Sequence, residues 1–172
     1  SAGAMSPVRT FRQAAGGDAP VRFLAVADMS AERVDGGHGG VPRELARVAA
    51  AAPLDFVLHA GDLAYDLHTD SGAVGDSFME DISPIASRTP YMVSPGNHED
   101  FGNFSHFKGR FTMPGWRPSG GPRNLWWSRD VGLVHLLSYN TEAYFSDAGD
   151  DANATLAAQY AWMAADLAAV NR

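Results

Sequence analysis

The chain has 172 residues, of which 45% are hydrophobic, and its 13 Lys and Arg against 20 Asp and Glu give a net charge of −7. This apolar content is enough for the core of a single folded domain and excludes a disordered or collagen-like chain. An acidic chain whose only lysine is Lys108 lacks the cationic surface that nucleic acids require, so we expect no nucleic-acid partner. No apolar run approaches the ~18 residues of a transmembrane helix, so we expect no membrane span. There is no cysteine, which excludes disulfides and thiolate chemistry.

The first half of the chain alternates apolar runs with helical patterns. Short apolar runs predict three buried strands, at residues 21–27, 54–60 and 90–94. Helical spacing between them predicts helices over 42–52 and about 71–87, the second with a break at Pro84. This order is typical of βαβ units, and it predicts an α/β fold with a parallel sheet.

The second half changes pattern after a polar, aromatic-rich segment. Residues 124–129 and 133–139 predict two strands of an antiparallel hairpin, joined by residues 130–132. Residues 155–170 predict an amphipathic helix with a core-facing stripe that contains Tyr160, Met163 and Leu167. Trp116, Trp126 and Trp127 are expected to pack beneath the hairpin.

A polar cluster follows each of the three predicted parallel strands. These clusters contain Asp28, then Gly61-Asp62-Leu63-Ala64-Tyr65, then Gly96-Asn97-His98-Glu99. Ligands of open α/β sheets bind beyond the carboxyl ends of the strands, so we expect these side chains to meet at one rim. Carboxylate, phenolate and amide oxygens suit hard cations such as Fe(III), Mn(II) or Mg(II), and Zn(II) is also compatible.

Each of these residues also has a purely structural interpretation. Asp28 can be a turn residue, and Asp62 and Asn97 can be helix caps. Tyr65 can be a core aromatic, and His98 can be a structural hydrogen-bonding group. Their occurrence at three successive strand ends favours metal binding for the set as a whole.

The same residues carry a resemblance to a known family. The blocks at 61–65 and 96–99, with Asp28 upstream, resemble the first three signature blocks of the metallophosphoesterases. Tyr65 narrows this to the purple acid phosphatases, and residues 57–60 and 159–163 are also similar to that family. The resemblance runs from about Val21 to the C-terminus. It implies one half of an αββα sandwich, with parallel βαβ units followed by an antiparallel hairpin.

The resemblance also implies the roles of the site residues. Asp28 and Tyr65 would bind Fe(III), Asp62 would bridge both metals, and Asn97 would bind a divalent ion (Zn, Mn or Fe). His98 would contact the phosphate of the substrate or assist proton transfer. A metal-activated water or hydroxide would then hydrolyse small phosphomonoesters, so no Ser or Cys nucleophile is needed. Ala27-Asp28-Met29-Ser30 departs from the usual Gly-Asp-x-Gly of the family but keeps the carboxylate.

The family also uses three downstream histidines, in a Val-x-x-His-like block and a Gly-His-x-His block, and neither occurs before Arg172. His135, in Leu133-Val134-His135-Leu136, does not match. We therefore expect residues 21–172 to be the N-terminal half of a catalytic domain, with the C-terminal half as the partner that supplies the histidines. Residues 1–20 are expected to be a tag remnant and the end of a preceding β-domain or linker.

Two sequons, at Asn103 and Asn153, suggest glycosylation. With the resemblance, they predict a secreted or a vacuolar or lysosomal protein. His59, in a predicted buried strand, is expected to be a core histidine, and Asp66 and Glu99 are expected to orient their neighbours. The alternatives to a purple-acid-phosphatase-like enzyme are another metallophosphoesterase, such as a phosphodiesterase or protein phosphatase, and a catalytically inert half-domain that serves as an interaction fragment.

Overall fold

The computed structural model describes residues 8–11, 13, 16–31, 40–115, 117, 124–145 and 152–170. A parallel sheet contains β1 (Phe23–Val26), β2 (Phe56–Ala60) and β3 (Tyr91–Ser94), in the order β1-β2-β3. Helix α1 (Gly40–Ala51) follows β1, and helix α2 (Ala73–Ala86) lies between β2 and β3. The predicted βαβ order and parallel sheet are confirmed.

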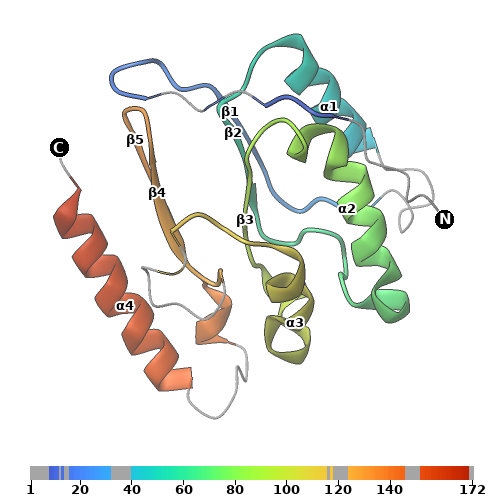
Figure 1. The fold of residues 1–172 in the computed structure, drawn as a ribbon. Coiled ribbons are helices and arrows are strands. Elements are labelled where there is room, and N and C mark those ends of the chain that lie inside the picture. Colours follow the sequence, from blue (N-terminus) through green and yellow to red (C-terminus); the bar gives the residue numbers. More distant parts are fainter. Residues whose placement is uncertain are drawn as a thin grey trace.

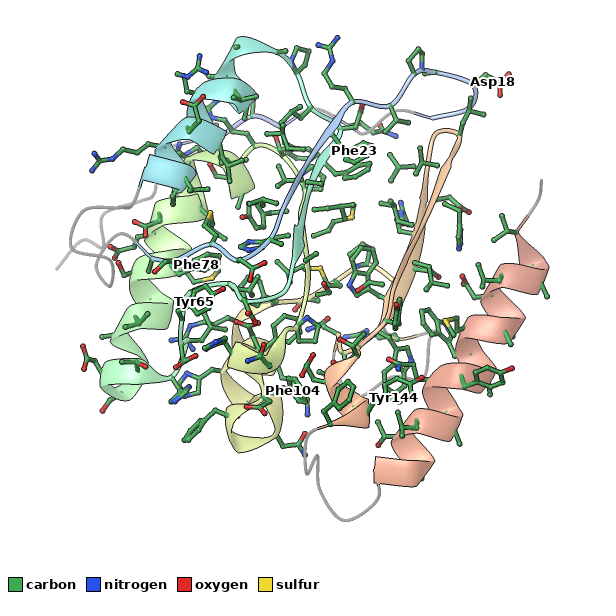
Figure 2. All side chains as sticks on the ribbon, turned by 180° about the vertical axis from the view of Figure 1, so that it is seen from behind. Asp18, Phe23, Tyr65, Phe78, Phe104 and Tyr144 are labelled. Atoms are coloured by element: carbon green, nitrogen blue, oxygen red, sulfur yellow. The ribbon has the colours of Figure 1, made fainter. Side chains whose placement is uncertain are left out.

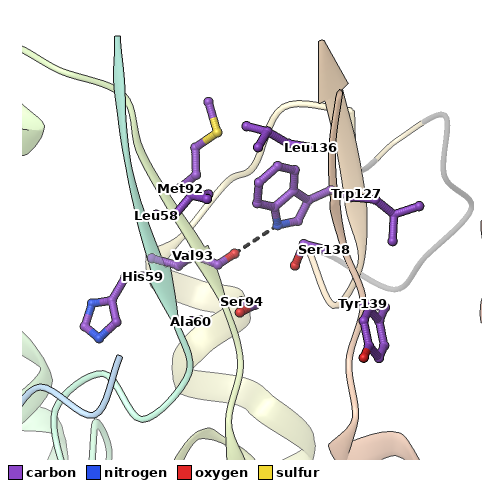
Figure 3. A pocket seen from close by; sticks show the side chains of 11 residues that line it. Leu58, His59, Ala60, Met92, Val93, Ser94, Trp127, Leu136, Ser138 and Tyr139 are labelled. Carbon is purple, nitrogen blue, oxygen red and sulfur yellow. Dashed lines mark hydrogen bonds between the residues drawn. The ribbon is translucent and has the colours of Figure 1, made fainter. Parts of the chain in front are cut away.

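The second sheet is the antiparallel pair β4 (Trp127–Val131) and β5 (Val134–Ser138). Figure 1 shows four layers, with α1 and α2 outside the parallel sheet, then the hairpin, then α4 (Ala152–Ala169). The indole Nε1 of Trp127 donates a hydrogen bond of 2.9 Å to the backbone oxygen of Val93, which ties the hairpin to β3 (Figure 3). The chain therefore has the predicted layers of one half of an αββα sandwich.

Large apolar side chains from both sheets and from the helices fill the core. Leu58 and Met92 face Trp127 and Leu136 across a cavity of about 200 Å³ between the sheets (Figure 3). Trp126 and Trp127 are each 1% exposed, so their predicted packing is confirmed, whereas Trp116 lies outside the described residues.

Strand β1 is less buried than its apolar sequence predicts. Its residues alternate between exposed and half-buried, and Phe23 is 44% exposed. The reason is its position at the edge of the sheet, where it pairs with β2 alone among the described strands.

The apolar stripe predicted for the last helix is wrong at Tyr160 and Leu167, whereas Met163 is half-buried. Tyr160 and Leu167 are 66% and 44% exposed, whereas Gln159 is 1% exposed and Trp162 packs 6.4 Å from the ring of Trp126. The helix is rotated relative to the prediction because a polar side chain, Gln159, occupies the buried face.

Two helices also differ from expectation. Helix α2 continues through Pro84, which stands in its last turn, so the predicted break is absent. Helix α3 (Phe101–Arg110) forms in the segment for which no helix is predicted, with left-handed backbone at Gly102, Asn103 and Phe104. Those three conformations interrupt the regular geometry on which sequence periodicity depends.

Three short 3-10 helices complete the described structure: η1 (Thr69–Gly72), η2 (Asn97–Glu99) and η3 (Glu142–Tyr144). Within the described ranges, no helix is both long and apolar enough to cross a membrane.

Candidate active site

The polar clusters that follow the three parallel strands meet at one edge of the sheet. Asp28 follows β1, Asp62 follows β2 and Asn97 follows β3. All three line a crevice of about 300 Å³, together with Gly61 and Gly96. The parallel register of the strands creates this meeting point, because it places their carboxyl ends side by side.

The backbone at this edge is unusual. Asp28, Asp62 and Tyr65 all have left-handed conformations, with φ of 52°, 49° and 44°. Non-glycine residues rarely adopt this region, and such conformations concentrate at functional sites. Here all three residues carry side-chain oxygens, so the strained backbone coincides with three of the candidate metal ligands.

Gly61 and Gly96 permit the close approach of the second and third clusters. A Cβ on Gly61 would lie 3.0 Å from the Cα of Gly96, and a Cβ on Gly96 would lie 2.7 Å from the backbone nitrogen of Asp62 and still closer to its Oδ1. A larger residue at either position would push the strand ends apart.

Tyr65 lies beside Asp28 and His98. Its hydroxyl donates a hydrogen bond of 2.9 Å to Asp28 Oδ1, and its ring centroid is 4.4 Å from that of His98. Figure 2 shows Tyr65 above Phe104 of α3. Loss of hydration, the hydrogen bond to Asp28 and the charges of Asp62 and Asp28 raise the pKa of the Tyr65 phenol above its usual value. A cation bound among these oxygens would reverse this, because it would stabilise the phenolate.

His98 is half-buried and held in place from two sides. Its Nδ1 bonds to Asp66 Oδ1, and its backbone N–H donates to Asp62 Oδ1 at 3.3 Å. Burial lowers the pKa of His98, but the hydrogen bond and charge of Asp66 outweigh burial and raise it overall. The loops after β2 and β3 are thereby joined at the residue predicted to contact substrate.

Glu99 connects the loops after β2 and β3 through hydrogen bonds to their backbone N–H groups. It is 2% exposed, and its carboxylate accepts hydrogen bonds of 2.9 Å from the backbone N–H groups of Asp62, Leu63 and Gly96. Burial raises the pKa of Glu99 to about 7, against the opposing effect of these hydrogen bonds. Glu99 and Asp66 thus orient their neighbours, as expected.

The donor chemistry of the crevice fits hard metal ions. Asp28, Asp62 and Asn97 present carboxylate and amide oxygens, and Tyr65 adds a phenol beside Asp28. In the part of the chain that the structure describes, no group of three or more His, Cys, Asp or Glu side chains is placed to hold a metal. That result is expected for the candidate ligand set, because two of its four residues, Tyr65 and Asn97, are neither His, Cys, Asp nor Glu.

Sequence reasoning missed one wall of the crevice. Tyr139, Thr141 and Glu142, from the segment after β5, line it together with the strand ends. Their position depends on how the hairpin packs on β3, so no local sequence signal could have identified them.

Several other predicted residues lie away from the crevice lining. His59 is a buried core residue, 1% exposed, whose Nδ1 lies 3.0 Å from the hydroxyl of Tyr91. Its Nε2 has no hydrogen-bond partner among the described residues, and burial lowers its pKa to about 4. Asn103 is exposed on α3, and its Oδ1 accepts a hydrogen bond from Lys108. Asn153 lies in α4, but its side chain is outside the described residues.

Comparison with known proteins agrees with this geometry. The calcineurin-like phosphoesterase family matches residues 21–164. Acid phosphatase type 7 of Danio rerio is 43% identical over 76% of this chain and 29% of its own length. Acid phosphatase type 7 of Homo sapiens is 42% identical over 77% of this chain and 28% of its own length. This chain therefore spans less than a third of the length of these relatives.

A solved structure shows the same fold. The purple acid phosphatase isolated from seeds of yellow lupin (Lupinus luteus) superposes with a TM-score of 0.63 at 23% identity, over 92% of this chain and 29% of that chain. The family itself is shown by the match over residues 21–164, and the sequence relatives include further purple acid phosphatases. The chain belongs to the calcineurin-like phosphoesterase family and is homologous to the purple acid phosphatases.

Proposed function

We propose that this chain provides the N-terminal part of a binuclear-metal phosphatase that hydrolyses phosphomonoesters. The observation that carries the proposal is the meeting of Asp28, Asp62 and Asn97 in one crevice, with Tyr65 bonded to Asp28. Acid phosphatases that are 42–43% identical to this chain support the same activity.

The candidate ligands have distinct roles in this proposal. Asp28 and Tyr65 would hold Fe(III), Asp62 would be shared by both ions, and Asn97 would hold a divalent ion, Zn, Mn or Fe. When bound, the metals act as Lewis acids that lower the pKa of a water molecule and stabilise charge on the phosphoryl group. His98, fixed by Asp66 and by the backbone contact with Asp62, binds the phosphate of the substrate.

The remaining metal ligands are histidines of a C-terminal half, which is the partner of this chain in the active enzyme. The homologues are several times longer than the region they share with this chain, which supports that arrangement. We further propose a secreted or a vacuolar or lysosomal location, with glycans on Asn103 and Asn153.

Replacement of Asp62 by alanine tests the proposed activity. In the full-length protein, Asp62→Ala removes the bridging carboxylate, and we expect hydrolysis of p-nitrophenyl phosphate to fall by at least about 10³-fold, since metal clamping of the phosphoryl group is lost. Asp76→Ala, on α2 and outside the crevice lining, is the matched control and should retain turnover. Turnover unchanged in Asp62→Ala would refute the proposal.

A further inference from the structure

The crevice has a wall that the proposed metal chemistry does not use. Tyr139, Thr141 and Glu142 line it together with Asp28, Asp62 and Asn97. The side chain of Tyr139 is 48% exposed, and Thr141 Oγ1 donates a hydrogen bond of 3.0 Å to Glu142 Oε1. An aromatic ring and a carboxylate therefore line the same crevice as three of the candidate metal ligands.

Buried hydrogen bonds fix this wall. Asn140 is fully buried, and its backbone N–H donates a hydrogen bond of 2.7 Å to the Oε1 of Gln159. Its backbone oxygen accepts a hydrogen bond of 3.0 Å from the Nε2 of Gln159. The Oδ1 of Asn140 accepts the backbone N–H of Glu142 at 3.0 Å. The wall is thus preorganised before any ligand binds, which reduces the entropic cost of binding.

The charge of the crevice indicates what this wall can bind. The described lining residues include three carboxylates, those of Asp28, Asp62 and Glu142, and no Lys, Arg or His. Metal ions held by Asp28 and Asp62 would neutralise those two charges. Glu142 would remain as a negative charge in a crevice that Tyr139 also lines, and a carboxylate and an aromatic ring in one crevice attract an organic cation.

We propose that Tyr139 and Glu142 bind the cationic leaving group of the substrate, so that the preferred substrates are phosphomonoesters of amino alcohols. This inference rests on the proposed phosphatase function and specifies its substrate class. The ammonium group lies against the face of the Tyr139 ring and near the Glu142 carboxylate, while the phosphate faces the opposite wall. In hydrolysis, the oxygen of water bonds to phosphorus, the ester P–O bond breaks, and the departing oxygen takes a proton to give the free amino alcohol and inorganic phosphate.

The first experiment compares phosphocholine with glycerol 2-phosphate, which has no positive charge, in the metal-loaded full-length protein. We expect kcat/KM for phosphocholine to exceed that for glycerol 2-phosphate by about 10-fold, the scale of a cation–aromatic contact supported by a carboxylate. Glu142→Gln and Tyr139→Leu should each lower the phosphocholine value about 3- to 10-fold and leave the glycerol 2-phosphate value within about twofold.

Three control variants make the comparison specific. Tyr139→Phe keeps the ring face and should retain the preference. Tyr144→Leu removes an exposed tyrosine that does not line the crevice, and Glu80→Gln removes an exposed carboxylate on α2; both should behave as the wild type. Equal kcat/KM for the two substrates in the wild type, or an undiminished preference in Glu142→Gln, would overturn the inference.

A binding measurement separates this inference from the proposed activity. Choline alone, titrated into the metal-free full-length protein, should shift the NMR resonances of the Tyr139 ring saturably, and Glu142→Gln should weaken its affinity several-fold. The absence of saturable shifts would overturn the inference even if the protein is an active phosphatase. Saturable binding in a protein that hydrolyses no phosphomonoester would refute the proposed function and, with it, the assigned substrate class, although Tyr139 and Glu142 would still form a cation site.

Discussion

The individual residues of the crevice are positioned by contacts that a sequence reveals only in part. Asp28, Asp62 and Asn97 could be predicted as neighbours because each follows a predicted parallel strand, and the carboxyl ends of parallel strands share one edge of the sheet. The sequence could not predict that Glu99 accepts three backbone N–H groups from two loops, since this depends on the close approach of Gly61 and Gly96. The candidate metal ligands could therefore be predicted from the sequence more readily than the hydrogen bonds that position them.

A substitution at Gly96 tests this close approach. In Gly96→Ala, the added methyl group overlaps Asp62, so we expect a loss of about 1–3 kcal/mol in the free energy of unfolding and displacement of the Asp62 carboxylate. Chemical denaturation measures the first effect, and metal affinity measures the second. Gly109→Ala is the matched control: a Cβ there meets nothing within 4 Å, and alanine in α3 should stabilise the protein slightly. Equal stability of the two variants would contradict the packing argument.

At the scale of the elements, α4 shows why the spacing of apolar residues alone did not predict which face of the helix is buried. Apolar spacing put Tyr160 and Leu167 in the core, yet Gln159 is buried because it completes the backbone hydrogen bonds of Asn140. A glutamine on a buried face gives no hydrophobic signal, and its partner lies 19 residues away. The strands and the hairpin were predictable because their signals are local.

The buried Gln159 pairing should contribute strongly to stability. Gln159→Ala leaves the backbone N–H and oxygen of Asn140 without these partners, and we expect a loss of about 2–4 kcal/mol in the free energy of unfolding. Urea denaturation provides the measurement. Tyr160→Ala, at the adjacent exposed position, should cost less than about 0.5 kcal/mol. If Gln159→Ala lowered the free energy of unfolding as little as Tyr160→Ala does, the hydrogen bonds between Gln159 and Asn140 would not be what holds α4 in place.

The attachment of α4 to the hairpin should also depend on pH. His135 of β5 bonds through Nδ1 to Asp130 and through Nε2 to Asp166 of α4, each at 2.7 Å. The hydrogen bond with Asp130, together with that of Asp166 and both charges, raises the pKa of His135 despite its partial burial. Because the folded-state pKa is raised, the stabilisation is fully present below the unfolded value of about 6.5 and is lost as pH rises through the folded value.

Thermal denaturation across pH tests this pairing. The difference in midpoint between wild type and His135→Gln should be largest near pH 5.5 and should shrink as pH rises above the folded-state pKa. Asp166→Asn should show the same trend, although it also weakens the bond from Ser128 Oγ to Asp166. A midpoint difference that is independent of pH would contradict the role assigned to protonated His135.

For the whole molecule, the central claim is that this chain carries part of a binuclear metal site. The layers and the crevice follow from its own sequence, but Asp28, Asp62, Tyr65 and Asn97 are only part of the ligand set that the family resemblance implies. The chain spans 28–29% of its acid phosphatase relatives, and the proposed function assigns the remaining ligands to histidines of a C-terminal half. The two histidine blocks that the family resemblance implies do not occur among these 172 residues, so the sequence cannot identify those ligands.

Metal content tests this claim most directly. Elemental analysis of the purified full-length protein, with intact masses recorded, should give two metal ions per molecule, at least one of them iron. The isolated 172-residue chain should hold fewer than two, and Asp62→Ala in the full-length protein should lose metal because the bridging ligand is gone. Two ions retained by Asp62→Ala, or two ions bound by the 18.3 kDa chain alone, would contradict the account.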